Sequence, residues 1–210
     1  MFLPSGEGVT LSAARRRLES LITERLKPGV DKSLIDQRIW TLLGQTRAVM
    51  FTDLSGFSRH VAKFGIVHFL QTIYESVRIF VPLIEKHDGV LLKAEADSLL
   101  AIFSLPHHAL SCAIAMQDAT KRYNEGVPPE EQILLGVGLG YGEMLQIGEE
   151  DVFGAEVNAA SKLGEDVAKG SDILVTEHFR QHLGEITGIE FAKLDFIPPG
   201  AEAAYAVKYR

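Results

Sequence analysis

The pattern of apolar and polar positions divides the chain into a helical extension and a longer region that mixes helices with strands. Apolar residues recur at helical spacing over Leu11–Leu26 and again over Lys32–Leu43, and Pro28-Gly29 separates the two segments. Strand patterns begin only after these helices. The pattern therefore predicts an N-terminal helical extension over residues 1–45 and one main domain over residues 46–210.

The main domain is predicted to begin with the order β-α-α-β-β-α-β, a variant of the split βαβ, ferredoxin-like plan. We expect an α+β fold, an α/β sandwich in which helices cover a mixed, mainly antiparallel sheet. The expected strands are Arg47–Phe51, Val90–Glu95, Ser98–Phe103, Ile133–Tyr141 with Met144–Ile147 pairing back on it, Ile173–Val175, Ile189–Leu194 and Ala203–Val207. The expected helices are Phe57–Phe64, Leu70–Glu85, Pro106–Arg122, Glu156–Val167 and Glu177–Leu183.

Four glycines alternate along one predicted strand. Gly136, Gly138, Gly140 and Gly142 all fall on one face, because side chains in a strand point to opposite faces in turn. A strand face without side chains indicates that something packs very close to it. A helix of the same chain is the simplest occupant, and a partner subunit or a ligand are the alternatives.

Composition and charge narrow the functional classes. Hydrophobic residues make up 46% and charged residues 23% of the chain, as in an ordinary globular protein. The net charge of -7 argues against general binding to nucleic acid or to an anionic membrane surface. No apolar run approaches the length of a membrane span, and no secretory signal is evident at the N-terminus. A single cysteine, Cys112, fits a reducing compartment, so we expect a cytoplasmic protein.

Two aspartates stand within apolar strand patterns. Asp53 ends the first strand of the main domain, and Asp97 lies between the strands of a predicted hairpin. A carboxylate in such a place is costly to desolvate without a cation, so two of them brought together by a sheet suit divalent metals that handle nucleotide phosphates. Taken singly, Asp53 is equally a helix cap and Asp97 a turn residue. The segment Leu54-Ser55-Gly56-Phe57 leads into a helix, and its backbone N–H groups suit a phosphate.

A second set of polar residues matches an adenine nucleotide. Lys93 only donates hydrogen bonds and Asp151 only accepts them, which fits the ring nitrogen and the amino group on the adenine edge. Asn158 and Lys162 are one helical turn apart and face the same way. Asn158 suits a ribose or the attacking hydroxyl, and Lys162 suits phosphate charge. Judged one at a time, each of these residues is more simply a helix-entry, internally bonded or surface residue.

Three motifs, in order along the chain, resemble the catalytic domain of class III nucleotidyl cyclases. They run from Phe51 to Phe57, from Lys93 to Asp97 and from Phe153 to Lys162. The resemblance extends from Arg47 to Tyr209 and implies the class III form of the ferredoxin-like fold. It implies the conversion of ATP to 3′,5′-cyclic AMP and pyrophosphate by a head-to-tail homodimer, with active sites between the two domains.

The same resemblance assigns a role to each candidate residue. Asp53 and Asp97 would bind two Mg²⁺ or Mn²⁺ ions per active site. The partner subunit would supply the adenine-selecting pair, the residue that steadies the transition state and the phosphate-binding cation, which are Lys93 with Asp151, Asn158 and Lys162. The alternatives are a catalytically weak, cyclase-like dimer that binds nucleotide as a regulatory module, and a cyclase for GTP or a pyrimidine nucleotide.

Four features depart from the family pattern and motivate these alternatives. Ala96 stands where glycine is usual, and a positive φ there would cost on the order of 1 kcal/mol. Glu95 stands where an apolar residue is usual, and it could pair with Lys93 or add negative charge near the metals. Lys162 replaces an arginine, which keeps the charge and loses the two-pronged geometry. No lysine clearly marks the last hairpin between Phe196 and Tyr205.

A histidine pair offers a weaker metal candidate. His178 and His182 lie one helical turn apart, as zinc ligands can, but no third ligand accompanies them in the sequence. We therefore interpret them as a polar helix face.

Overall fold

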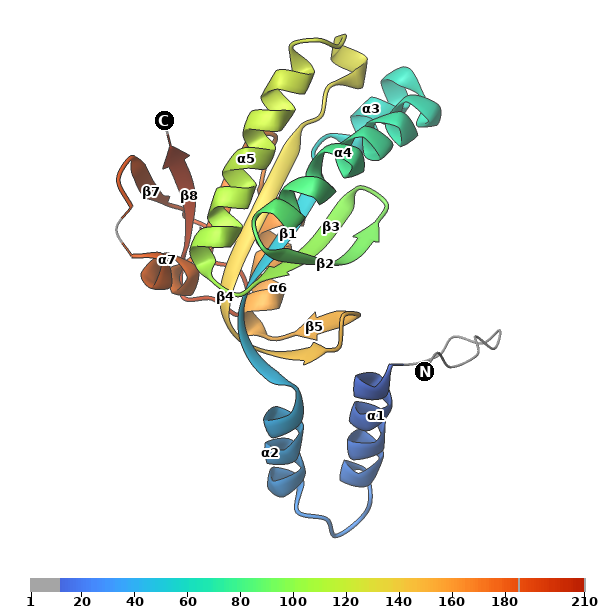
Figure 1. Cartoon of the computed structure of the whole chain (residues 1–210), viewed down its shortest axis with the longest axis vertical. Coiled ribbons are helices and arrows are strands. Elements are labelled where there is room, and N and C mark those ends of the chain that lie inside the picture. The colour runs from blue at the N-terminus through green and yellow to red at the C-terminus, as the bar shows by residue number, and fades with distance from the viewer. Residues whose placement is uncertain (1–11, 185, 210) are drawn as a thin grey trace.

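The structure is a computed structural model that describes residues 12–184 and 186–209, with the side chains of residues 57–60 outside the description. Its strands form one open sheet in the order β2-β3-β1-β4-β6-β8-β7, and β5 pairs with the end of β4 (Figure 1). Among the described strands only the β4–β6 pairing is parallel, so the expected α+β sandwich with a mainly antiparallel sheet is confirmed.

The helices and strands follow one another along the chain largely in the predicted order. The strands are β1 (Gly44–Leu54), β2 (Gly89–Glu95), β3 (Ser98–Phe103), β4 (Leu135–Ile147), β5 (Asp151–Phe153), β6 (Ile173–Thr176), β7 (Ile189–Lys193) and β8 (Ala204–Tyr209). The helices are α1 (Ala13–Arg25), α2 (Lys32–Leu43), α3 (Phe57–Phe64), α4 (Ile66–Lys86), α5 (Pro106–Asn124), η1 (Pro129–Glu131), α6 (Ala155–Ser161), η2 (Lys162–Val167) and α7 (Glu177–Leu183).

Alternate residues of β1 supply two separate cores, one on each face of the sheet. Ala48 and Met50 join the larger core, which α4 and α5 cover. Val49 points the other way and packs with Met144 and Val157 under α6. This alternation explains why the strand reads as a continuous apolar run, because a strand buried on both faces has no polar side.

The glycine face of β4 receives α6 and η2 of the same chain. A Cβ at Gly138 would lie 2.1 Å from the carbonyl oxygen of Ala160, and a Cβ at Gly140 would lie 2.6 Å from that of Glu156. Backbone therefore meets backbone along this contact, which side chains on β4 would prevent. Of the three occupants considered for the glycine face, the helix of the same chain is confirmed.

The far end of β4 corrects one prediction. Met144–Ile147 does not pair back on the Ile133 strand, because β4 continues unbroken through Gly142 to Ile147. Gly142 lies inside this strand, where its missing side chain leaves room for Glu156. The end of β4 pairs instead with β5, whose residues were assigned to no element.

The helix predicted over Glu156–Val167 is also more complex than expected. It begins at Ala155 as an α-helix and changes after Ser161 into the π-helix η2. A π-helix is uncommon and often occurs near functional sites. Its wider turn changes which side chains share a face, so the spacing of Lys162 relative to later residues could not be read from helical periodicity alone.

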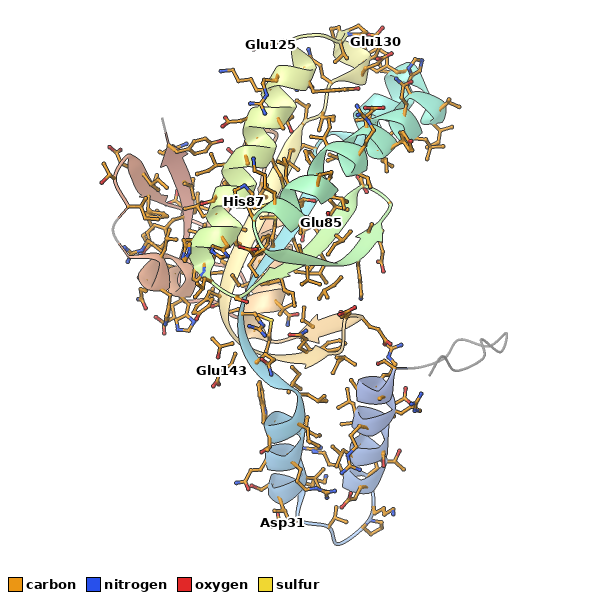
Figure 2. All side chains as sticks on the ribbon, viewed as in Figure 1. Asp31, Glu85, His87, Glu125, Glu130 and Glu143 are labelled. Atoms are coloured by element: carbon orange, nitrogen blue, oxygen red, sulfur yellow. The ribbon has the colours of Figure 1, made fainter. Side chains whose placement is uncertain are left out.

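The two N-terminal helices form a hairpin at one end of the sheet (Figure 1). Asp31 caps α2 by accepting the backbone N–H groups of Ser33 and Leu34. Side chains of the two helices meet along a seam (Figure 2), and that seam closes over the end of β4 through Leu21, Ile35, Ile39, Leu43 and Ile147. Both predicted helices are present, although Leu11 lies outside the described residues.

The longest described helix, α4, is amphipathic. Phe69, Phe80 and Ile84 are buried in the core, whereas Val67 and Tyr74 are exposed. Within the described residues, no helix combines the length and apolar character needed to cross a membrane.

Because β4 and α6 are in such close contact, we expect one added methyl group on β4 to lower the stability of the protein strongly. Gly138→Ala should destabilise the protein by about 3 kcal/mol, because the new Cβ would collide with backbone that cannot move aside. Gly126→Ala is the matched control, since its Cβ would meet only the Tyr123 carbonyl oxygen at 3.7 Å. Urea denaturation of both variants measures the difference. Equal midpoints for the two variants would contradict the described packing.

Candidate active site

The sheet brings the two predicted metal-binding aspartates together. Asp53 lies near the end of β1, and Asp97 lies in the turn between β2 and β3. Pairing of β1 with β3 places Thr52 opposite Leu99, and the Leu99 N–H donates to the Thr52 hydroxyl at 3.2 Å. The Ser98 hydroxyl then donates to Oδ1 of Asp53 at 3.2 Å. The turn that carries Asp97 is thus tied to the strand that carries Asp53.

The electrostatics at Asp53 favour a bound cation. Burial, together with the nearby charges of Asp97 and Glu165, raises the pKa of Asp53 to about 6, against the lowering effect of the Ser98 hydrogen bond. Among the described residues, no lysine or arginine forms an ion pair with Asp53 or Asp97. Two close carboxylates without a cation fit a divalent metal.

The size of the acidic group is consistent with such a metal. The described residues contain no cluster of three or more histidine, cysteine, aspartate or glutamate side chains able to hold an ion. Mg²⁺ needs no such cage, because it commonly takes one or two carboxylates and completes its shell with water and substrate phosphates. Asp53 and Asp97 supply two such carboxylates.

The turn before Asp97 shows the strain that the sequence indicated. Ala96 has φ of 50°, in the left-handed region where glycine is favoured, so its side chain costs on the order of 1 kcal/mol. The turn keeps this conformation without glycine.

Lys93 and Asp151 meet as an ion pair. Nζ of Lys93, on β2, lies 2.7 Å from Oδ2 of Asp151, the first residue of β5. Asp151 is also fixed through Oδ1, which accepts the Val152 N–H at 2.9 Å. The Lys93 side chain is 34% exposed and that of Asp151 is 16% exposed, so both reach a surface cavity. Glu95 does not take Lys93 away from Asp151.

This cavity has a volume of about 150 Å³. Its lining combines apolar walls with the ion pair and two further carboxylates: Phe51, Lys93, Glu95, Ser98, Leu99, Leu100, Asp151, Val152 and Glu165. Such a mixture suits a flat, partly polar ring that makes a small number of directed hydrogen bonds.

Asn158 lies on α6, and Lys162 is the first residue of η2. Both side chains are exposed. Lys162 forms an ion pair with Asp166, four residues later. Within the described part of the chain, neither Asn158 nor Lys162 forms a hydrogen bond or an ion pair with Asp53 or Asp97.

The loop after Asp53 offers fewer phosphate contacts than the sequence indicated. Leu54 is buried, and the Ser55 N–H already donates to the Leu134 carbonyl oxygen at 2.7 Å. Gly56 adopts φ of 91° and precedes the first turn of α3, which begins at Phe57. The phosphate-binding hypothesis for Leu54–Phe57 therefore narrows to the backbone amides of Gly56 and Phe57; the Phe57 side chain lies outside the described residues.

Sequence reasoning missed two acidic neighbours of the site. Glu165 lines the cavity and lies close enough to Asp53 to affect its pKa, and Asp166 holds Lys162. Both lie on η2, and no sequence signal announces a π-helix. The sequence shows that both residues are acidic, but it does not show which way their side chains point.

The histidine pair behaves as a polar helix face. Nδ1 of His178 lies 2.8 Å from the Tyr141 carbonyl oxygen, and Nδ1 of His182 lies 2.8 Å from the carbonyl oxygen of His178. The rings of His178 and His182 stack edge to face. One ring nitrogen of each histidine is thus hydrogen-bonded to a backbone carbonyl oxygen.

Comparison with known proteins agrees with this geometry. The family model for the adenylate and guanylate cyclase catalytic domain matches residues 44–198. The match begins at the first residue of β1 and includes all of the candidate site residues.

Curated relatives share this region at low identity. The "Serine/threonine-protein kinase pkn2" of Myxococcus xanthus is 29% identical over 133 residues, which is 63% of this chain and 16% of that protein. "Putative adenylate cyclase 3" of Rhizobium meliloti (strain 1021) is 26% identical over 144 residues, 69% of this chain and 24% of that protein. The chain thus spans less than a quarter of the length of either relative.

Solved structures share the fold. The adenylate/guanylate cyclase/hydrolase from Silicibacter pomeroyi aligns with a TM-score of 0.65 at 23% identity, covering 80% of this chain and 98% of that one. The adenylyl cyclase CyaB from P. aeruginosa aligns with a TM-score of 0.63 at 17% identity, covering 80% and 96%. With its site geometry and the family match over most of its length, this chain belongs to the adenylate and guanylate cyclase catalytic domain family.

Proposed function

We propose that this chain is an adenylyl cyclase domain that converts ATP to 3′,5′-cyclic AMP and pyrophosphate as a homodimer. The observation that carries the proposal is the pair of close carboxylates, Asp53 and Asp97, without a cation among the described residues. A nucleotide triphosphate with its metal ions supplies the missing positive charge. The single cysteine, Cys112, and the use of ATP favour the cytoplasm.

The ion pair between Lys93 and Asp151 supports adenine as the base. Lys93 can donate to the N1 acceptor of adenine, and Asp151 can accept from the 6-amino group. Guanine carries the opposite pattern, with a donor at N1 and an acceptor at O6. In the same position it would place a donor against Lys93 and an acceptor against Asp151, so neither hydrogen bond would form. Similarity to adenylate cyclases at low identity is consistent with this choice.

A second copy of the chain would complete the site. Asn158 and Lys162 are exposed, so a partner copy would have access to both side chains. A two-fold axis would create two equivalent sites from one self-complementary interface. In each site one copy would contribute the acidic pair, and the other copy would contribute Asn158, Lys162 and the base pocket.

Each residue then has a defined task in the ring closure. Two Mg²⁺ or Mn²⁺ ions, when bound, would neutralise phosphate charge and make the 3′-hydroxyl more acidic. Asp53 and Asp97 would hold them. Asn158 would orient the ribose so that its 3′-oxygen faces the α-phosphate in line with the pyrophosphate leaving group, and Lys162 would offset charge on the phosphate. The new bond joins the 3′-oxygen to the α-phosphorus as the bond to the pyrophosphate oxygen breaks, and the proton of the 3′-hydroxyl passes to solvent water.

A second candidate function rests on the acidic residues of η2. Lys162 is paired with Asp166, and Glu165 adds negative charge near Asp53. Both features weaken the attraction for a triphosphate. They favour a domain that binds nucleotide slowly or weakly and acts as a regulatory dimer.

Complementation between variants tests the main proposal. Asp53→Ala, Asp97→Ala and Asn158→Ala should each abolish cyclic AMP formation, measured by mass spectrometry of the product from ATP with Mn²⁺. An equal mixture of Asp53→Ala with Asn158→Ala should recover about a quarter of the wild-type activity, because half of the dimers are mixed and each has one intact site.

The matched control is a mixture of Asp53→Ala with Asp97→Ala. These variants damage the same half of each site, so no mixed dimer contains an intact one. Recovery in this control, or its absence in both mixtures of folded proteins, would contradict the shared site.

Stability of Asp53→Asn tests the acidic pair independently of activity. The folded-state pKa of about 6 exceeds the ordinary value of 3.8, so ionisation of Asp53 destabilises the folded protein as pH rises through this range. At about pH 7 without metal, Asp53→Asn should be more stable than wild type by about 1 kcal/mol, and near pH 4 the two should agree.

Mn²⁺ should raise the melting temperature of the wild type and leave that of Asp53→Asn unchanged. Asp195→Asn, an exposed position, is the control and should follow the wild type throughout. A metal-free Asp53→Asn protein that is less stable than wild type at about pH 7 would show that the carboxylate is an ordinary structural group.

Release of Lys162 from Asp166 should improve nucleotide binding. Asp166→Asn removes the ion pair and one negative charge, so the KM for ATP should fall about threefold while kcat changes little. Steady-state kinetics with Asp195→Asn as the charge-matched control measures the effect. A rise in KM would indicate that Asp166 positions Lys162 for its task and does not compete for it.

A further inference from the structure

The N-terminus of α1 contacts the turn that immediately precedes Asp151. Oε1 of Glu150 accepts the backbone N–H of Ser12 at 3.1 Å, and Oε2 of Glu150 lies 3.5 Å from Nε of Arg15. Ser12 is the N-cap of α1 and also caps it through its hydroxyl, which accepts the Arg15 N–H. The Glu150 carboxylate therefore lies at the positive end of a 13-residue helix, where an anion is stabilised.

A second contact fixes the same hairpin from the side of β4. Ile147 is the register partner of Asp151, and it is 1% exposed beneath α1 and α2. Leu21 and Leu43 are among the side chains that bury it. The residue before Asp151 and the residue opposite it are thus both held by the N-terminal helices.

Strand β5 needs such support. It has three residues and pairs with Leu145–Ile147 of β4 alone among the described strands. A short two-stranded hairpin is marginally stable by itself. Its position is therefore set by what it packs against, and a small displacement of Asp151 would move it from hydrogen-bond range of a bound base.

We propose that Glu150 is a positioning residue that couples the α1–α2 hairpin to the base-recognising pair Lys93–Asp151. Docking of α1 on Glu150 holds β5 in place, and loosening of that contact lowers nucleotide affinity and base selectivity. The inference rests on the proposed function. The helices concerned precede residue 44, where the family match begins, so this coupling belongs to the extension of this chain.

Kinetics of charge-matched variants in the full chain test the inference. Glu150→Gln and Arg15→Gln should each raise the KM for ATP about fivefold and lower the preference for ATP over GTP by a similar factor, with kcat within about twofold. Glu149→Gln is the matched control, because it removes the same charge one residue away at an exposed position. The reversed pair Arg15→Glu with Glu150→Arg should recover part of the loss.

Hydrogen exchange of the nucleotide-free protein gives a readout that needs no activity. Amides of residues 149–153 should exchange faster in Glu150→Gln than in Glu149→Gln, while the rest of the domain exchanges as in wild type. If the wild type forms no cyclic nucleotide, the proposed function fails and this comparison alone decides the coupling. The inference would be overturned if Glu150→Gln and Glu149→Gln behaved alike in kinetics and in exchange. It would also be overturned if Glu150→Gln changed the KM for ATP and for GTP equally and exchanged faster throughout the domain.

Discussion

The close approach of α6 and η2 to the glycine face of β4 determines where every candidate site residue lies. The helix sits so near the strand that its inward residues are limited to side chains that fit this contact, such as Glu156, Ala160 and Leu163. Asn158 and Lys162 consequently face outward. The same contact that stabilises the domain also turns both side chains to the surface, where a second copy would meet them in the dimer that we propose.

The acidic pair lowers the stability of the folded domain when Asp53 is ionised. Asp53 is held near Asp97 and Glu165 in a partly buried place where its charge is unfavourable. Ala96 adds a strained turn beside it. Natural proteins retain such unfavourable features chiefly where a ligand compensates for them. A nucleotide with its metals would relieve the repulsion, so binding and folding are coupled at this point.

Local patterns predicted most of the fold, but not the directions of several side chains. Helical and strand periodicity placed α2, α3 and α7 at their observed bounds, and the motifs located Asp53, Lys93 and Asp151. The expectation that Met144–Ile147 forms a separate strand was wrong, because β4 continues through Gly142, which fits against Glu156 without a break in the strand. The π-helix and its acidic residues were missed, since that geometry depends on packing against β1 and β4. The contact of α1 with Glu150 joins segments far apart in sequence, which no local pattern reveals.

The most direct test of the central claim is a crystal structure of the protein with Mn²⁺ and a non-reactive ATP analogue. The account predicts a two-fold dimer in which the triphosphate reaches Asp53 and Asp97 of one copy, while Asn158 and the pair Lys93–Asp151 of the other copy contact the ribose and the base. An analogue bound entirely within one copy, or bound away from Asp53, would contradict it.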